Sequence, residues 1–190
     1  MVAGKLNTFV WVHEEDARAL RERAEENAAR ESAWLTAQRE RLGLSESQPT
    51  PEPIRLEALR LRPQKWPGQS QIVEASVRVR LSHPDLAGPW APFTPEERER
   101  QRLAGRRPGS PRESFTDKLA LDLDPDLVAL AQLASYRISE PIVGQLRAEN
   151  LLGPGRSHSR AARLRREELQ AQIYTVGRII REAIALSLDR

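Results

Sequence analysis

Residues 118–138 read KLALDLDPDLVALAQLASYRI, and their hydrophobic period changes partway along. Between Lys118 and Leu123 every second residue is leucine, which predicts a strand with its three leucines on one face. Asp124-Pro125-Asp126 then has the chemistry of a helix start, an N-cap followed by proline. From Leu127 the hydrophobic residues follow the helical period, so we expect a helix directly after the strand.

The sequence predicts further helices beyond this unit. Ser139-Glu140-Pro141 resembles a new N-cap with Glu and Pro in the first turn, which predicts a helix over 140–150. Gly153-Pro154-Gly155 ends that helix. A long amphipathic pattern covers 160–190, and Thr175 within it could cap a separate final helix.

The N-terminal half predicts a strand, a helix and a hairpin. KLNTFVWV (residues 5–12) is β-branched and aromatic, and the acids that follow it favour a helix over 14–42 with Gly43 as its C-terminal cap. Residues 71–81 (QIVEASVRVRL) alternate in hydrophobicity and predict a strand. Residues 54–62 are a second candidate strand, and the Trp-Pro-Gly between the two indicates a hairpin turn.

These elements indicate a helix-rich α+β protein in two units. We expect a small α+β domain over 1–87 and a strand-helix-helix domain over 115–190, joined by a linker rich in Pro and Arg over 88–114. The linker holds one short helix, signalled by a capping box from Thr94 to Glu97. Because each unit would have only a small core, we also expect self-association, as a dimer.

Composition and motifs favour a non-enzymatic cytoplasmic protein. The 190 residues contain no cysteine, and no apolar run approaches the roughly 20 residues that span a bilayer. We therefore expect no disulfide, membrane segment, metal or cofactor. The three histidines, His13, His83 and His158, belong to different predicted elements, and His13-Glu14-Glu15 lacks the second histidine of a zinc-protease motif. Lys occurs only three times among the 30 basic residues, so Arg supplies most of the positive charge.

The segment from Leu119 to Leu146 resembles the core of ribbon-helix-helix DNA-binding proteins, in which a strand is followed by two capped helices. The resemblance implies a dimer whose two strands, one from each chain, form an antiparallel ribbon in the major groove. It implies base-reading roles for the outward residues Lys118, Ala120 and Asp122. The turn at Ser139 and Glu140 would then hold a phosphate at the start of the second helix.

Two other segments offer alternative recognition elements. TVGRIIREAIALSL (Thr175–Leu188) is similar to the second helix of the same family, which implies that Thr175, Arg178 and Arg181 lie beside the phosphate, with 139–174 as an insertion. Ser139–Arg156 is instead similar to the helix-turn-helix of MerR-like regulators.

The sequence therefore predicts a dimeric DNA-binding protein, either a transcriptional regulator or a plasmid or phage maintenance factor. The alternative is a structural or adaptor protein that associates through the amphipathic helices over 14–42 and 160–190. An ordinary helical hairpin with a leading strand, in which Ser139 and Thr175 are simple caps, is also compatible with the pattern. Pairing of the 118–123 strand between two chains would favour the ribbon, whereas its pairing with the N-terminal hairpin would exclude it.

Overall fold

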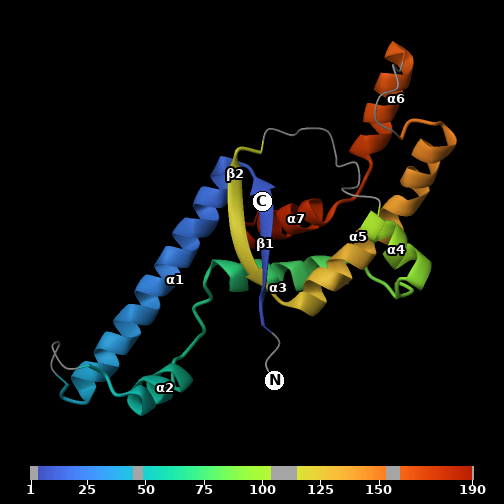
Figure 1. Cartoon of the computed structure of the whole chain (residues 1–190). Coiled ribbons are helices and arrows are strands. Elements are labelled where there is room, and N and C mark those ends of the chain that lie inside the picture. Colours follow the sequence, from blue (N-terminus) through green and yellow to red (C-terminus); the bar gives the residue numbers. More distant parts are fainter. Residues whose placement is uncertain (1–3, 45–48, 104–114, 153–158, 190) are drawn as a thin grey trace.

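The computed structural model describes residues 4–44, 49–103, 115–152 and 159–189 (Figure 1). The elements in these residues are β1 (Leu6–Val12), α1 (Glu14–Arg41), α2 (Glu52–Arg60), α3 (Gln69–Ser82), α4 (Pro95–Leu103), β2 (Asp117–Leu123), α5 (Pro125–Ala148), α6 (Arg160–Ala171) and α7 (Val176–Ser187). The described chain is thus mostly helical with one two-stranded sheet, and the predicted helix-rich α+β class is confirmed.

The two strands pair antiparallel within one chain, and we call this pair the ribbon. The register runs from Leu6 opposite Leu123 to Val12 opposite Asp117, with Phe9 opposite Ala120 at its centre. Alternation of the side chains puts the leucines of β2 and the valines of β1 on the inner face, where they are buried. The strand predicted at 118–123 therefore finds its partner in the strand predicted at 5–12, so the sheet needs neither a second chain nor the N-terminal hairpin.

A single main core lies between the ribbon and the helices. Helices α3 and α7 pack on each other and on the inner face of the ribbon, and the first turns of α1 and α5 complete the cluster. Leu20 and Val73 in this core precede residue 88, whereas Leu121 and Ile180 follow residue 114. Residues of the two units predicted at 1–87 and 115–190 thus share one core.

Apart from α4, which lies between the two repeats, the described elements follow the same order twice, as a strand, a long helix and two shorter helices. Phe9 and Ala120 each lie five residues before the first residue of the helix that follows, and they face each other in the ribbon. An approximate two-fold axis therefore passes between them. In Figure 1 the pair α1–α2 extends to one side of this centre and α5–α6 to the other.

The buried positions of the helices follow the same two-fold relation. Ala17 and Leu20 in α1 correspond in spacing to Val128 and Ala131 in α5, and all four are buried. The same correspondence holds between α3 and α7. The buried triplets are Ile72, Val73 and Val77 in α3, and Ile179, Ile180 and Ile184 in α7.

Several predicted helix ends are confirmed. The Asp124 carboxylate accepts from the Asp126 amide, and the Thr175 hydroxyl accepts from the Arg178 amide, so α7 begins as a separate helix. Thr94 and Glu97 form the reciprocal bonds of a capping box at the start of α4. Gly43, with φ of +67°, takes the left-handed conformation just after α1.

The predicted hairpin is wrong, because both of its strands are helices. Residues 54–62 fall mostly in α2, and 71–81 lie inside α3. The alternation of valine in α3 also fits a helix, since Val73, Val77 and Leu81 are spaced four residues apart and are all buried. Val79, which belongs to the alternating pattern but not to the helical one, is 63% exposed.

The predicted helix start at Ser139 is also wrong, because α5 continues unbroken from Pro125 to Ala148. Pro141 lies inside this helix, where it removes one backbone hydrogen bond, and the burial of Val143 and Leu146 beyond it offsets that loss. Ser139 is consequently an interior helix residue with 1% of its surface exposed. The described residues of the MerR-like segment therefore contain no turn between two helices at this point; residues 153–158 lie outside the described part.

Candidate nucleic-acid interface

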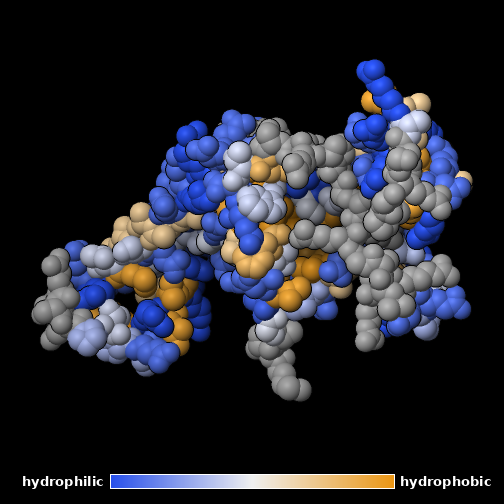
Figure 2. Space-filling view, turned by 45° about the horizontal axis from the view of Figure 1, so that its top comes forward, coloured by the Kyte–Doolittle hydropathy of each residue, from blue (hydrophilic) through white to orange (hydrophobic). Residues whose placement is uncertain are grey.

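The outer face of the ribbon is the surface that this fold leaves open at its centre. The outward residues of the two strands are all exposed, whereas their inward neighbours, apart from the first residue Leu6, are buried or partly buried. We call these residues the ribbon face: Asn7, Phe9 and Trp11 from β1, and Lys118, Ala120 and Asp122 from β2. Phe9 and Trp11 are 58% and 51% exposed, which is unusual for large aromatic side chains. Figure 2 shows hydrophobic side chains on the surface in the middle of the molecule.

Contacts across the strands order the ribbon face. The Asn7 amide nitrogen donates to the Asp122 carboxylate at 2.9 Å. The Lys118 ammonium lies 4.1 Å from the centre of the Phe9 ring, a cation–π contact that holds the lysine over the strand centre. Polar, aromatic and charged groups thus stand at defined positions on one narrow surface.

The first turns of α3 and α7 lie at the two ends of the ribbon. On one side, the Ser70 hydroxyl of α3 accepts from the Asp122 amide at 3.0 Å. On the other, Arg181 of α7 donates to the Trp11 carbonyl at 3.2 Å, and a Cβ at Gly177 would lie 4.0 Å from Val10. Each helix start therefore touches the strand end nearest to it. The partial positive charge of a helix N-terminus attracts anions, so both flanks of the ribbon face carry this polarity.

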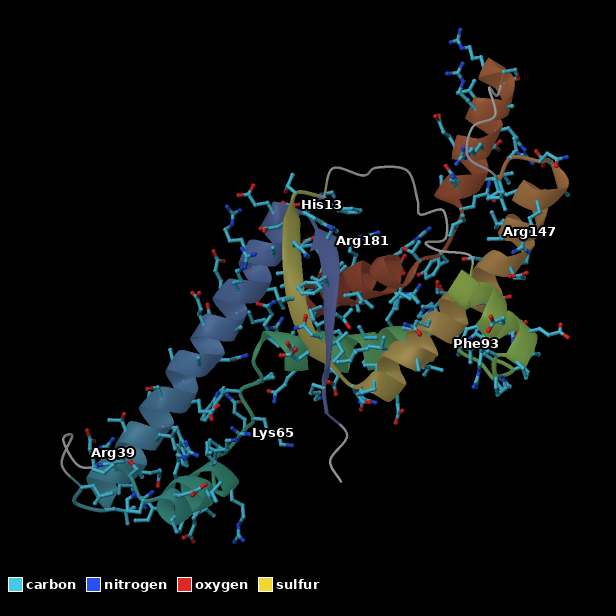
Figure 3. The ribbon with its side chains drawn as sticks, viewed as in Figure 1. His13, Arg39, Lys65, Phe93, Arg147 and Arg181 are labelled. Carbon is cyan, nitrogen blue, oxygen red and sulfur yellow. The ribbon has the colours of Figure 1, made fainter. Side chains whose placement is uncertain are left out.

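A small aromatic and cationic cluster stands beside the end of β1. The guanidinium of Arg181 lies 3.9 Å from the centre of the Phe115 ring, and the ring centre of His13 lies 4.8 Å from the same ring. Figure 3 shows His13 and Arg181 close to this end of the ribbon. Arg181 also donates a hydrogen bond to the Trp11 carbonyl, and this bond fixes it to β1, the strand that contributes half of the ribbon face.

Arg178, the other arginine in the first part of α7, belongs to a polar network between α3 and α7. Its guanidinium bonds to Glu182 at 2.9 Å and lies over the Tyr174 ring at 4.6 Å. The nearly buried Arg80 of α3 bonds to the same Glu182 at 2.8 Å and to Asp85 at 2.7 Å. This network joins α3 to α7, so its first role is structural.

The network shifts the pKa values of its members in directions that keep its carboxylate ionised and its phenol protonated. Burial alone would raise the pKa of Glu182, but hydrogen bonds from Tyr174, Arg80 and Arg178 together lower it. Burial and the neighbouring Glu182 raise the pKa of the Tyr174 phenol to about 12. The phenol therefore stays protonated at neutral pH and donates its hydrogen bond to Glu182.

The structure separates the six residues predicted to bind DNA into three groups. Lys118 and Ala120 lie on the ribbon face, as predicted for an outward set. Thr175, Arg178 and Arg181 lie at the start of α7, which contacts the end of β1. Ser139 is the exception. Its buried hydroxyl bonds to the backbone of Tyr174, donating to the carbonyl at 3.1 Å and accepting from the amide at 3.0 Å, so it is closed to any ligand.

The β1 half of the ribbon face was absent from the sequence prediction. Asn7, Phe9 and Trp11 lie in a strand that was expected, but no local pattern identified that strand as the partner of 118–123. The available signal was the repeat of one arrangement, a predicted strand followed directly by an acidic helix start, at residues 6–16 and again at 117–126.

Within the described residues, no group of three or more His, Asp or Glu side chains is arranged to hold a metal ion. None of the described helices is both long and apolar enough to span a membrane. Comparisons of the chain with protein-family models, with curated proteins and with solved structures find no match.

Proposed function

We propose that the protein is a non-enzymatic DNA-binding protein, a transcriptional regulator or a plasmid or phage maintenance factor, whose ribbon face enters the major groove. The observation that carries the proposal is the ribbon itself: two paired strands of one chain, exposed on their outer face and flanked by two helix N-termini. A two-stranded ribbon fits the width of the major groove, and helix N-termini attract phosphate. The proposal departs from the sequence prediction in one respect, because the ribbon is complete without a second chain.

The side chains of the ribbon face have the chemistry that base edges require. Asn pairs with adenine, Lys donates to guanine, Asp accepts from the amino group of cytosine, and the Ala methyl group contacts thymine. Asn7, Lys118, Ala120 and Asp122 supply these four groups on one surface. The exposed rings of Phe9 and Trp11 add apolar area that a groove contact would remove from water.

Basic residues around the ribbon favour association with a polyanion. The whole chain carries a formal charge of +3, and Lys5, Arg78 and Arg181 make contacts close to the ribbon ends. Lys5 and Arg78 are ion-paired with Glu74, and Arg78 also with Asp124. Binding of phosphate would therefore compete with these pairs, and we expect affinity to fall steeply as salt rises.

Binding of the full chain to labelled duplex DNA over a range of salt concentrations tests the proposal. Lys118→Ala should weaken binding of the preferred duplex about 5- to 100-fold, because the ammonium is in the centre of the ribbon face. Arg147→Ala is the matched control, since it also removes one positive charge but lies near the far end of α5, and it should change affinity little. Equal effects of the two variants, or no duplex binding at low salt, would refute the proposal.

An adaptor function remains the second candidate, and the arm formed by α1 and α2 favours it. Leu42, Leu56 and Leu61 are each more than half exposed there. A hollow of about 420 Å³ lies between the two helices, lined by Ala28, Glu31, Ser32, Leu35, Thr36, Arg39, Thr50 and Arg55. Exposed leucines and a hollow on the same arm suit a helical partner. Under this alternative, Leu56→Glu would abolish a stoichiometric protein complex, whereas Lys118→Ala would leave it intact.

A further inference from the structure

We propose that one chain binds DNA alone and reads a non-palindromic site in a single orientation. This inference rests on the proposed function, and it specifies the kind of duplex that the ribbon face would recognise. It follows from a contrast in the ribbon, whose backbone is nearly symmetric while its side chains are not.

The backbone symmetry sets which positions correspond. Because Phe9 and Ala120 face each other and lie at equal distances from the helix starts, the two-fold axis relates each outward residue of β1 to one of β2. Asn7 corresponds to Lys118, Phe9 to Ala120, and Trp11 to Asp122. The axis of a ribbon in the major groove coincides with a local two-fold axis of the duplex, so corresponding residues would meet equivalent base positions.

At each of these three positions the chemistry differs between the two halves. Where the β1 half has an amide, the β2 half has an ammonium group at the corresponding position. In the same way a phenyl ring corresponds to a methyl group, and an indole corresponds to a carboxylate. The β1 half is neutral and aromatic, whereas the β2 half carries one positive and one negative charge. A base pair and its inverse would therefore have different interaction energies with the two halves.

The flanking helices differ in the same way. Glu74 of α3 corresponds in spacing to Arg181 of α7. Glu74 is paired with Lys5 just before β1, whereas Arg181 donates to the carbonyl of Trp11 near the end of β1. The N-caps also differ, with Gly68 before α3 and Thr175 before α7. One end of the ribbon thus adds a carboxylate where the other adds a guanidinium.

A protein with two identical chains presents the same residues to both halves of its site, which is why such sites are palindromic. Here the two halves belong to one chain and are different, so a palindrome offers no advantage. The orientation with the better match in each half should be preferred, and each mismatched base pair should lower affinity about 5- to 150-fold.

Selection from a randomised duplex library with the full chain tests the inference. We expect a non-palindromic consensus, and native mass spectrometry should find one chain per duplex. A palindromic consensus bound by two chains would overturn the inference while leaving the proposed function standing. Failure to enrich any duplex would overturn the proposed function, and this inference with it.

A substitution at the centre gives a second readout. In Phe9→Ala both strands carry alanine on the two-fold axis, so inverting the central base step of the selected duplex should change affinity much less than in the wild type. In the wild type the same inversion should cost about 5- to 150-fold. Leu164→Ala, which removes a 59% exposed leucine from α6, should keep the wild-type penalty. An inversion penalty of full wild-type size in Phe9→Ala would contradict the assignment of Phe9 to the site centre.

Discussion

Ile180→Ala should destabilise residues on both sides of the 88–114 segment, because Ile180 lies in the single main core. The side chain is 2% exposed and belongs to the same cluster as Leu20 and Val73. Truncating a buried isoleucine to alanine costs about 2 to 5 kcal/mol, a large part of the roughly 5 to 15 kcal/mol of a typical domain. With a urea dependence of about 2 kcal/mol per molar, the unfolding midpoint should fall by about 1 to 2.5 M.

The positions of the tryptophans make this prediction specific. All four, Trp11, Trp34, Trp66 and Trp90, precede residue 91, whereas Ile180 is near the C-terminus. We therefore expect tryptophan fluorescence and far-UV circular dichroism to show the same lowered midpoint. Leu186→Ala, on the same helix but 51% exposed, is the matched control and should change stability by less than about 0.5 kcal/mol. A fluorescence midpoint that stays at its wild-type value in Ile180→Ala would refute the shared core.

Three further substitutions test individual contacts. Ser139→Ala should lower the free energy of unfolding by about 1 to 3 kcal/mol in urea titrations, because it leaves the Tyr174 amide without its hydrogen-bond acceptor while the Tyr174 carbonyl keeps the bond from Ser135, and it should leave DNA affinity unchanged. Arg80→Ala, which strips charged hydrogen bonds from a nearly buried site, should cost about 2 to 3 kcal/mol in the same assay; a cost near zero would contradict the network. Hydrogen bonds from Arg137 and from the Thr94 backbone lower the pKa of Glu97 from 4.5 to about 2. Its stabilising effect is therefore complete above about pH 4.5 and is lost as the pH falls to 2, so the melting temperatures of the wild type and Glu97→Gln should differ at pH 6 and converge at pH 2.

The sequence was most informative where a local pattern had only one structural solution. Alternating leucines followed by Asp-Pro-Asp predicted both β2 and the start of α5, since the N-cap and the change of period agree. The start of α7 at Thr175 was one of two alternatives, and the capping hydrogen bond to the Arg178 amide confirms it. Such signals depend on residues within a few positions of each other, which a single sequence displays directly.

Tertiary structure decided the segments that the sequence did not predict correctly. The valines of 71–81 fit both a strand and a helix, and it is packing on α7, about a hundred residues away, that selects the helix. Ser139 and Pro141 have the chemistry of a helix start, but burial of the residues around them keeps α5 continuous. The sequence also could not identify the strand that pairs with β2, because an alternating pattern predicts a strand but not which other strand it will join.

The feature on which the proposed function most depends is that one chain forms the whole ribbon, and this can be tested directly. The protein has no cysteine, so Phe9→Cys combined with Ala120→Cys introduces a single pair into exposed positions that face each other. The Asp122 amide points away from β1, toward Ser70, which makes the outward residues the non-hydrogen-bonded pairs of the ribbon. Such pairs have Cα atoms about 4.5 Å apart, a separation that a disulfide accepts.

On mild oxidation of this double variant at low concentration, we expect a disulfide within one chain. The product should migrate as a monomer on a non-reducing gel, and peptide mapping should find residue 9 linked to residue 120. Each single-cysteine variant is the control and should form no such link. A double variant that yields disulfide-linked dimers, or no cross-link at all, would contradict the pairing of β1 with β2 in one chain.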